Sequence, residues 1–216
     1  MWEDATTKEA FGQRRTYLRG RGLDAVMNYP FRNAALDYLH GGDVASVADA
    51  LMQICENYPA PALDCAMNFL STHDTERALT VIADEPANGR GREWQSGRSV
   101  TGEAYEEGML RLRMAYAIIY TLPGVPCLYY GDEIGMQGYR DPFNRGYYCW
   151  DSHEERLRPV LAQLAQLRHT CEAFHSGALR VLRADGGVLH YQRIGLVETA
   201  EIIVNRTEHI IVEPLA

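Results

Sequence analysis

The chain has 216 residues, of which 46% are hydrophobic and 10% aromatic, and its formal net charge is −8. This apolar content excludes a disordered chain and is sufficient to bury a sizeable core. The acidic balance, without any block of Lys or Arg, argues against nucleic acid and anionic membrane surfaces as partners. No stretch reaches the roughly 18 apolar residues that a membrane-spanning helix needs, so we expect no membrane partner.

The cysteines and the first residues favour a reducing compartment. The five cysteines are an odd number and none belongs to a C-x-x-C pair, so we expect reduced thiols and no structural zinc. The sequence begins Met1-Trp2-Glu3-Asp4, which is acidic where a signal peptide is basic and then apolar. We therefore expect a cytoplasmic protein. We also expect neither metal nor cofactor, because no metal-ligand spacing, P-loop or dinucleotide fingerprint occurs.

Apolar runs predict three buried strands, at residues 23–29, 65–70 and 126–130. Each run is as long as a parallel strand that is covered on both faces, and it is apolar throughout. Apolar residues at helical spacing predict helices at residues 44–55, 109–122 and 157–167. Alternating strands and helices favour an α/β fold with a parallel sheet.

The pattern changes after about residue 175. Residues 178–183 and 188–193 flank Ala184-Asp185-Gly186-Gly187, a sequence typical of a β-hairpin turn. Residues 202–205 and 209–212 predict a second hairpin. This end of the chain therefore reads as a small antiparallel β module.

Polar clusters follow two of the predicted strands. His73 and Asp74 come directly after the second strand, where an imidazole and a carboxylate can bind sugar hydroxyls or stabilise a cationic transition state. Asp74 could equally do no more than start a helix. Asp132 and Glu133 follow the third strand. Neighbouring carboxylates can serve as acid and base, but adjacent ones more often form a salt bridge or cap a loop.

A third cluster, at residues 139–150, combines tyrosines and a tryptophan with Arg and Asp. Aromatic faces of such a loop can pack against sugar rings while charged side chains hold hydroxyls. The alternative is a packed loop with an ion pair between Asp141 and Arg145.

Four motifs taken together resemble the neopullulanase and cyclomaltodextrinase group of the α-amylase family. Residues 23–34 resemble its sixth barrel strand with the following helix. Residues 68–77, Asn-Phe-Leu-Ser-Thr-His-Asp-Thr-Glu-Arg, resemble the seventh-strand motif, and residues 124–136 the eighth strand. Residues 141–145, with Trp150 following, match the next loop. The order and the separations agree over essentially the whole chain.

The resemblance implies part of a (β/α)8 TIM barrel, namely strands six to eight with their helices, in residues 1–174. The start of a C-terminal antiparallel β domain would follow in residues 175–216. Members of this family cleave or transfer α-glucosidic bonds with retention, so the implied substrate is an α-glucan oligosaccharide. They use a carboxylate nucleophile and a carboxylic acid about 5 to 5.5 Å apart.

The resemblance also implies roles for individual residues. Asp74 would hold ring hydroxyls of the sugar being cleaved and stabilise the transition state, and His73 would bind the same sugar. Tyr29, Asp141 and Arg145 would line the glucose sites.

The chain departs from the family pattern at its start. Nothing corresponds to strand four, which carries the nucleophile. The acid lies in a pattern like Gly-Glu-Val-Trp-Glu-Asp at the end of strand five, and Trp2-Glu3-Asp4 matches only the tail of that pattern. Glu3 corresponds to its second Glu. We therefore expect both principal catalytic groups to lie upstream, and the chain alone to be inactive.

Three functions remain open from the sequence. The first is a fragment of a hydrolase of maltodextrins, cyclomaltodextrins or pullulan, and the second is a transglycosylase of the same family. The third is a non-catalytic carbohydrate-binding or assembly module. We expect the isolated chain to be marginally stable or to self-associate, because a partial barrel exposes sheet edges that can pair with another copy.

Overall fold

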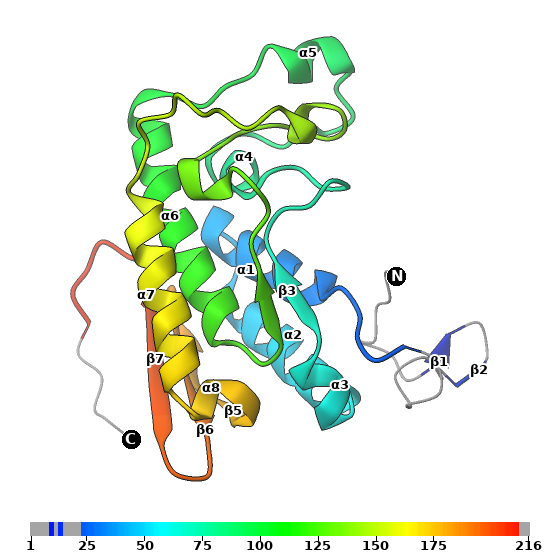
Figure 1. The fold of residues 1–216 in the computed structure, drawn as a ribbon, viewed down its shortest axis with the longest axis vertical. Coiled ribbons are helices and arrows are strands. Elements are labelled where there is room, and N and C mark those ends of the chain that lie inside the picture. The colour runs from blue at the N-terminus through cyan, green and yellow to red at the C-terminus, as the bar shows by residue number, and fades with distance from the viewer. Residues whose placement is uncertain (1–8, 11–12, 15–22, 212–216) are drawn as a thin grey trace.

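The computed structural model describes residues 9–10, 13–14 and 23–211 (Figure 1). Met1-Trp2-Glu3-Asp4 lies outside these residues, as does Val212. The helices are α1 (Tyr29–His40), α2 (Val44–Asn57), α3 (Ala60–Asp64), α4 (Ala78–Ala83), α5 (Arg92–Ser96), α6 (Gly102–Thr121), α7 (Leu157–Thr170) and α8 (Ala173–Ser176), with 3-10 turns η2 (Asp132–Ile134) and η3 (Phe143–Arg145). The strands are β1 (Glu9–Ala10), β2 (Gln13–Arg14), β3 (Met67–Phe69), β4 (Val125–Cys127), β5 (Ala178–Asp185), β6 (Val188–Ile194) and β7 (Thr199–Asn205).

A parallel sheet lies at the centre, where β3 and β4 run side by side (Figure 1). Met27 extends it through a parallel bridge to Met67 of β3. Two fully buried asparagines tie the strands together: Asn28 Nδ2 donates to Asn68 Oδ1 at 3.1 Å, and Asn68 Nδ2 donates to the Pro123 carbonyl at 2.7 Å. The predicted order of strand and helix is confirmed. α1 to α3 lie between Met27 and β3, α4 to α6 lie between β3 and β4, and α7 follows β4.

The strand prediction for residues 23–29 is wrong in its extent, because only Met27 forms a bridge and Tyr29 already begins α1. The Asn28 side chain accepts from the Phe31 N–H at 3.2 Å, and Pro30 follows within the first turn. An asparagine N-cap followed by proline favours a helix start strongly enough to end the strand early.

The predicted helices are confirmed. α2 and α7 match their expected ranges to within three residues, whereas α6 begins at Gly102, seven residues before the predicted start. α2 begins after Asp43, whose carboxylate accepts from the Ala45 N–H at 3.2 Å. Its buried residues Val47, Leu51 and Ile54 share one face, as residues three or four apart do. Among the described residues, no helix is both long and apolar enough to cross a bilayer.

The last three strands form one antiparallel sheet in the order β5-β6-β7. The hairpin predicted around residues 184–187 is confirmed by the pairing of β5 with β6. The second predicted hairpin is wrong: residues 202–205 do form a strand, but they pair with β6, while residues 209–211 are outside any strand. β7 pairs with β6 over its whole length, and among the described residues the segment 209–211 has no partner strand.

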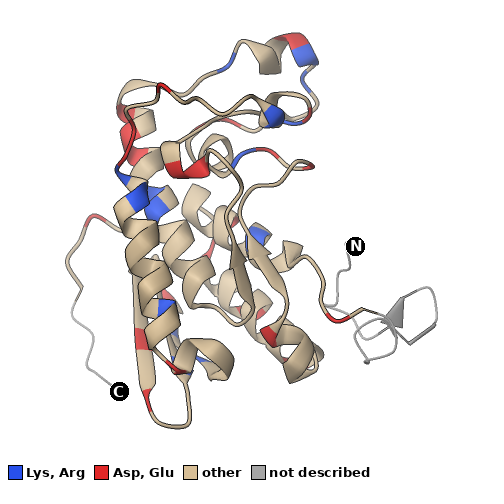
Figure 2. Cartoon of the chain, viewed as in Figure 1, with Lys and Arg blue, Asp and Glu red and all other residues tan. Residues whose placement is uncertain are grey.

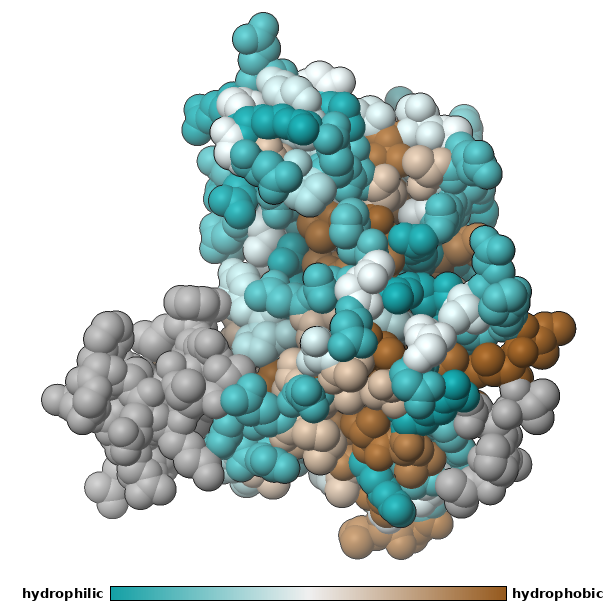
Figure 3. Space-filling view, turned by 180° about the vertical axis from the view of Figure 1, so that it is seen from behind, coloured by the Kyte–Doolittle hydropathy of each residue, from teal (hydrophilic) through white to brown (hydrophobic). Residues whose placement is uncertain are grey.

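One buried core joins the helices and this sheet. It includes Ile118 and Ile119 of α6 together with Leu189 and Tyr191 of β6. The domain boundary that we expect between residues 174 and 175 therefore stays a prediction. Exposed apolar residues occur at the β6–β7 turn, where Leu196 is 96% exposed, and Figure 3 shows apolar surface at that end of the molecule.

β4 differs from the expectation that each parallel strand is covered on both faces. Val125 is 51% exposed, and Leu128 and Tyr130 just after the strand are exposed as well. Within the described part of the chain, β4 pairs only with β3. Its other edge has no partner strand among the described residues, and part of its apolar surface faces solvent.

Candidate functional site

The turn after β3 carries His73 and Asp74. Ser71 and Thr72 are buried, and Ser71 Oγ accepts from the Ala78 N–H at 2.8 Å, which anchors the start of α4. The Asp74 N–H donates to Thr72 Oγ1 at 3.1 Å. Asp74 thus lies in a turn rather than starting a helix, so its carboxylate is free of the N-cap role that the sequence allowed.

Arg145 joins this turn to the loop after β4. Its Nη2 lies 3.6 Å from Asp74 Oδ1, and its Nε lies 2.8 Å from Asp141 Oδ1. His73 Nε2 lies 3.3 Å from Asp74 Oδ2. Four of the five predicted site residues, His73, Asp74, Asp141 and Arg145, therefore meet in one chain of ionisable side chains (the charged cluster), all about half exposed. The ion pair expected for a merely packed loop is present, but it is continuous with the His73-Asp74 turn.

Tyr29 lies at the neighbouring strand end, two residues after Met27. Its half-buried ring packs edge-on against Phe69 of β3, with the ring centroids 4.9 Å apart. The parallel pairing brings Tyr29 to the same edge of the sheet as the turn after β3. Ligands of parallel α/β sheets bind at this carboxyl edge.

Asn144 is a residue that the sequence did not single out. It is fully buried in η3, and its Nδ2 donates to the carbonyl oxygens of Thr72, His73 and Thr75. Its position inside the motif 141–145 was the one available signal, because an asparagine between Phe143 and Arg145 in a loop has no local pattern that predicts burial.

Arg77 and Asp132 form an ion pair beneath the site. Both side chains are essentially inaccessible to solvent, and Arg77 Nη1 lies 3.1 Å from Asp132 Oδ1. Tyr116 Oη donates to the other carboxylate oxygen at 2.7 Å. Burial raises the pKa of Asp132, while bonds from Ser71, Tyr116 and Arg77 oppose that rise. Asp132 thus forms a salt bridge, which is the alternative to catalysis that the sequence left open for the adjacent carboxylates of Asp132 and Glu133.

Arg77 also binds the backbone of the loop after β4. Arg77 Nη1 donates to the Tyr130 carbonyl at 2.6 Å, and its guanidinium lies over the rings of Tyr129 and Tyr130, 4.7 and 4.8 Å from their centroids. Burial is also the main cause that raises the pKa of Tyr116 well above its usual value. This network fixes the two loops relative to each other.

Aromatic side chains of the loop after β4 face solvent. Tyr147 is 100% and Trp150 86% exposed, and the rings of Tyr148 and Trp150 lie 4.7 Å apart. Exposed aromatic faces of this kind can pack against apolar faces of sugar rings. Figure 2 shows acidic and basic residues side by side in the loops that follow β3 and β4.

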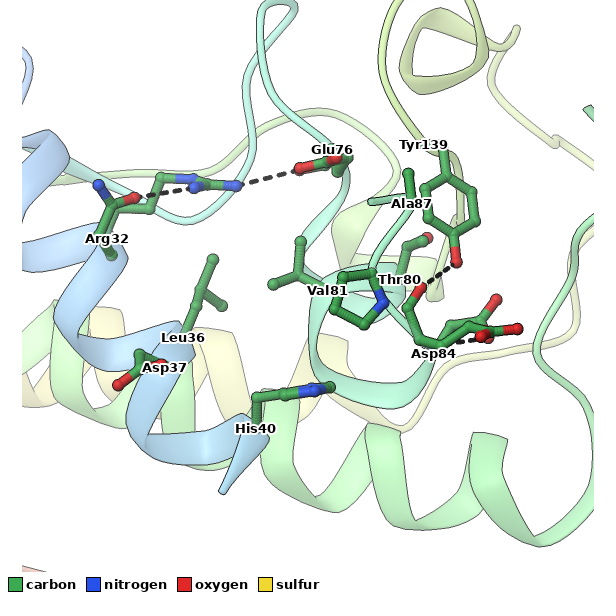
Figure 4. Close-up of a pocket in the computed structure, with 13 residues that line it drawn as sticks. Arg32, Leu36, Asp37, His40, Glu76, Thr80, Val81, Asp84, Ala87 and Tyr139 are labelled. Carbon is green, nitrogen blue, oxygen red and sulfur yellow. Dashed lines mark hydrogen bonds between the residues drawn. The ribbon is translucent and has the colours of Figure 1, made fainter. Parts of the chain in front are cut away.

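A pocket of about 360 Å³ lies elsewhere, between α1, α4 and residues 84–87 (Figure 4). Arg32 donates across it to the Glu76 carbonyl, and Tyr139 Oη donates to the Glu85 carbonyl at 2.6 Å. Neither His73 nor Asp74 lines it, so it is separate from the charged cluster. Among the described residues, no group of three or more His, Cys, Asp and Glu side chains could hold a metal ion.

Comparison with known proteins gives relatives over nearly the whole chain. The family model "Alpha amylase, catalytic domain" matches residues 3–176. A cyclomaltodextrinase of Geobacillus thermopakistaniensis (strain MAS1) is 33% identical over 213 residues, which cover 96% of this chain and 31% of that protein. An amylopullulanase of Thermoanaerobacter thermohydrosulfuricus is 33% identical over 188 residues, which cover 82% of this chain and 12% of that protein.

Solved structures show the same fold. The cyclic α-maltosyl-(1→6)-maltose hydrolase of Arthrobacter globiformis, in complex with cyclic α-maltosyl-(1→6)-maltose, matches with a TM-score of 0.72 at 31% identity. The match covers 89% of this chain and 39% of that one. The predicted fold class, part of a TIM barrel followed by antiparallel strands, is confirmed. The chain spans well under half of the length of these relatives.

Proposed function

Because the chain belongs to the α-amylase catalytic-domain family, we propose that it is part of a retaining hydrolase of α-glucosidic bonds in maltodextrins, cyclomaltodextrins or pullulan. The observation that carries this proposal is the convergence of His73, Asp74, Asp141 and Arg145 in one charged chain. The relatives named cyclomaltodextrinase and amylopullulanase support the substrate class.

The proposed role of Asp74 follows from its chemistry. In an oxocarbenium-like transition state, positive charge develops on the sugar, and a carboxylate that binds ring hydroxyls stabilises it. Arg145 lies between Asp74 and Asp141 and would orient both carboxylates toward a ligand. His73 would donate to the same sugar. Tyr29 would line the site from the neighbouring strand end.

We propose further that this chain does not hydrolyse α-glucans by itself. Retaining glycosidases need a nucleophile and an acid on opposite sides of the bond, and no residue of this sequence matches either motif position. Asp132 is closed off in its buried ion pair with Arg77, so it does not substitute for them.

The five unpaired cysteines favour a reducing, cytoplasmic compartment for the whole enzyme.

The first experiment is reducing-sugar release from maltotriose and β-cyclodextrin by the purified chain. Asp74→Asn is the site variant, and Asp49→Asn, an exposed residue of α2, is the matched control. We expect no release from any of the three proteins, together with maltotriose binding that Asp74→Asn weakens and Asp49→Asn leaves unchanged. Release that depends on Asp74 would refute the inactivity. Equal binding by all three would refute the site.

Self-association is a separate part of the proposal. β4 exposes Val125 beside an edge that no described strand pairs, and such edges recruit further strands. We expect light scattering to show dimers or larger species, and Val125→Lys to shift them toward monomer. Leu196→Lys, at the exposed β6–β7 turn, serves as the control. A monodisperse monomer of the unaltered chain would contradict this.

A further inference from the structure

Asn144 connects the loop after β4 to the backbone that carries the charged cluster. Its Nδ2 lies 3.2, 2.9 and 2.8 Å from the carbonyl oxygens of Thr72, His73 and Thr75. We propose that Asn144 is a positioning residue, which holds the turn at residues 72–75 so that the side chains of His73 and Asp74 project toward the loop after β4.

The orientation of the amide follows from its surroundings. Turned by half a rotation, the Asn144 amide would place its oxygen against three carbonyl oxygens, so the nitrogen faces the turn. The Oδ1 atom is then buried, and it has no hydrogen-bond partner among the described residues. An unpaired buried acceptor costs free energy. The bonds from Nδ2 to the three carbonyl oxygens of the turn offset this cost, because the compact neutral amide can donate to several carbonyls at once.

The hydrogen bonds within the turn all involve Thr72. The Thr75 N–H reaches its carbonyl at 3.4 Å, the Asp74 N–H donates to its Oγ1 at 3.1 Å, and its own N–H donates to Thr75 Oγ1 at 3.0 Å. None of them holds the carbonyl groups of His73 and Thr75, which Asn144 binds. The side chains of His73 and Asp74 are 60% and 58% exposed, so their own packing does not fix them. Their place is therefore set by the backbone beneath, which Asn144 binds at three of the four residues of the turn.

Arg145 adds a second contact to the same backbone but cannot replace Asn144. Its Nε donates to the His73 carbonyl at 3.0 Å while also facing Asp141. This side chain is 47% exposed, so water competes for its bonds. The buried amide is shielded from that competition.

The consequence for sugar binding rests on the proposed function. Displacement of the turn would move Asp74 away from Arg145, and a carboxylate that is misplaced by about 1 Å loses most of its value to a bound sugar. Asn144 would therefore affect ligand affinity without contacting the ligand.

The test is hydrogen exchange measured by mass spectrometry on the full chain. Asn144→Asp keeps the size of the side chain but removes the donor at about pH 8, where the carboxyl group is ionised. Asn88→Asp makes the same change at an exposed loop residue. We expect protection factors of the amides at residues 72–78 to fall about tenfold or more in Asn144→Asp, the effect of losing one hydrogen bond or more. We expect no change in Asn88→Asp and no change within α2 and α6 of either protein.

Lowering the pH gives a readout that a general packing defect would not show. A carboxyl group buried against carbonyl oxygens is neutral over a wider pH range than usual, and the neutral form donates one hydrogen bond. Protection of the turn in Asn144→Asp should therefore recover in part between about pH 8 and about pH 5. Asn144→Ala lacks any donor and should show no recovery. It also serves as the test variant if Asn144→Asp does not fold.

Three outcomes would overturn the positioning role: unchanged protection of the turn, an equal loss of protection in α2 and α6, or the same recovery in Asn144→Ala. Maltotriose affinity, measured by calorimetry, is the functional readout, and we expect it to be at least about tenfold weaker in Asn144→Asp than in Asn88→Asp. If the unaltered chain does not bind maltotriose, the proposed function loses support, while the exchange data still decide the role of Asn144.

Discussion

Removal of Arg77 should reveal how strongly the two site loops depend on their buried ion pair. The guanidinium is fully buried and binds Asp132 at 3.1 Å and the Tyr130 carbonyl at 2.6 Å. Arg77→Leu leaves the Asp132 carboxylate buried with only the Tyr116 and Ser71 hydroxyls as partners. Breaking a buried pair by deleting one member costs about 3 to 5 kcal/mol. That is a large part of the roughly 5 to 15 kcal/mol that stabilises a typical domain.

The double variant separates the cost of an orphaned charge from the value of the pair. Replacement of both members by apolar residues of similar volume is often neutral or stabilising. We therefore expect Arg77→Leu combined with Asp132→Leu to be more stable than Arg77→Leu alone, by about 2 kcal/mol.

Urea denaturation at 25 °C, followed by circular dichroism, provides the free energies of unfolding. The protein concentration is set so that all variants have the same oligomeric state. Absence of a cooperative transition in Arg77→Leu counts as a loss at the upper end of the expected range. Asp132→Leu alone completes the cycle. A loss below about 1 kcal/mol in Arg77→Leu, or a double variant whose loss equals the sum of the two single losses, would refute the reasoning.

Three further predictions concern other parts of the fold. Gly131 has a φ of +84°, and a Cβ there would overlap the Met136 sulfur. Gly131→Ala should therefore cost at least about 1 to 2 kcal/mol in urea denaturation, whereas Gly91→Ala, where a Cβ meets nothing within 4 Å, should cost much less. The hydrogen bond from Arg156 holds the pKa of Glu154 below its usual 4.5. The ionised carboxylate therefore stabilises the fold above pH 4.5, and this stabilisation is lost as the pH falls through the lowered pKa. Glu154→Gln should thus lower stability by at most about 1 kcal/mol at neutral pH and not at all in acid, as thermal melting at several pH values would show; a loss independent of pH would contradict this. Burial lowers the pKa of Arg193 to about 10, and its guanidinium group binds two backbone carbonyls. Arg193→Lys should lower the free energy of unfolding in urea by about 2 kcal/mol, and a variant as stable as the unaltered chain would refute a need for the guanidinium group.

Much of the fold could be predicted from local sequence patterns. Helices such as α2 followed from apolar residues at helical spacing after an Asp43 cap, and both the spacing and the cap are local properties. The hairpin of β5 and β6 followed from its Gly-rich turn. Local signals failed where they competed, as at Asn28, which ends one strand by starting a helix. They also failed at β7, which pairs with the preceding strand β6 across the turn at residues 195–198 and not with the segment that follows it.

The candidate site divides in the same way. Its exposed members, among them Asp74 and Arg145, were predicted because charged residues after apolar strands stand out and match a family motif. Asn144 and Arg77 were not assigned roles, because their chemistry depends on burial, and burial depends on which loops meet.

The sequence alone determined the family, the order of strands and helices, and the residue types that can bind a sugar, because these depend on spacing along the chain. Only the tertiary structure decided that Arg145 bridges Asp74 and Asp141, that Asp132 is enclosed with Arg77, and that Asn144 holds the turn between β3 and α4. Apart from the local pair of Arg145 and Asp141, these contacts join residues that are far apart in sequence; Asn144, for example, lies 72 positions after the Thr72 that it binds. Such contacts form only when parallel strands bring their ends to one edge of a sheet.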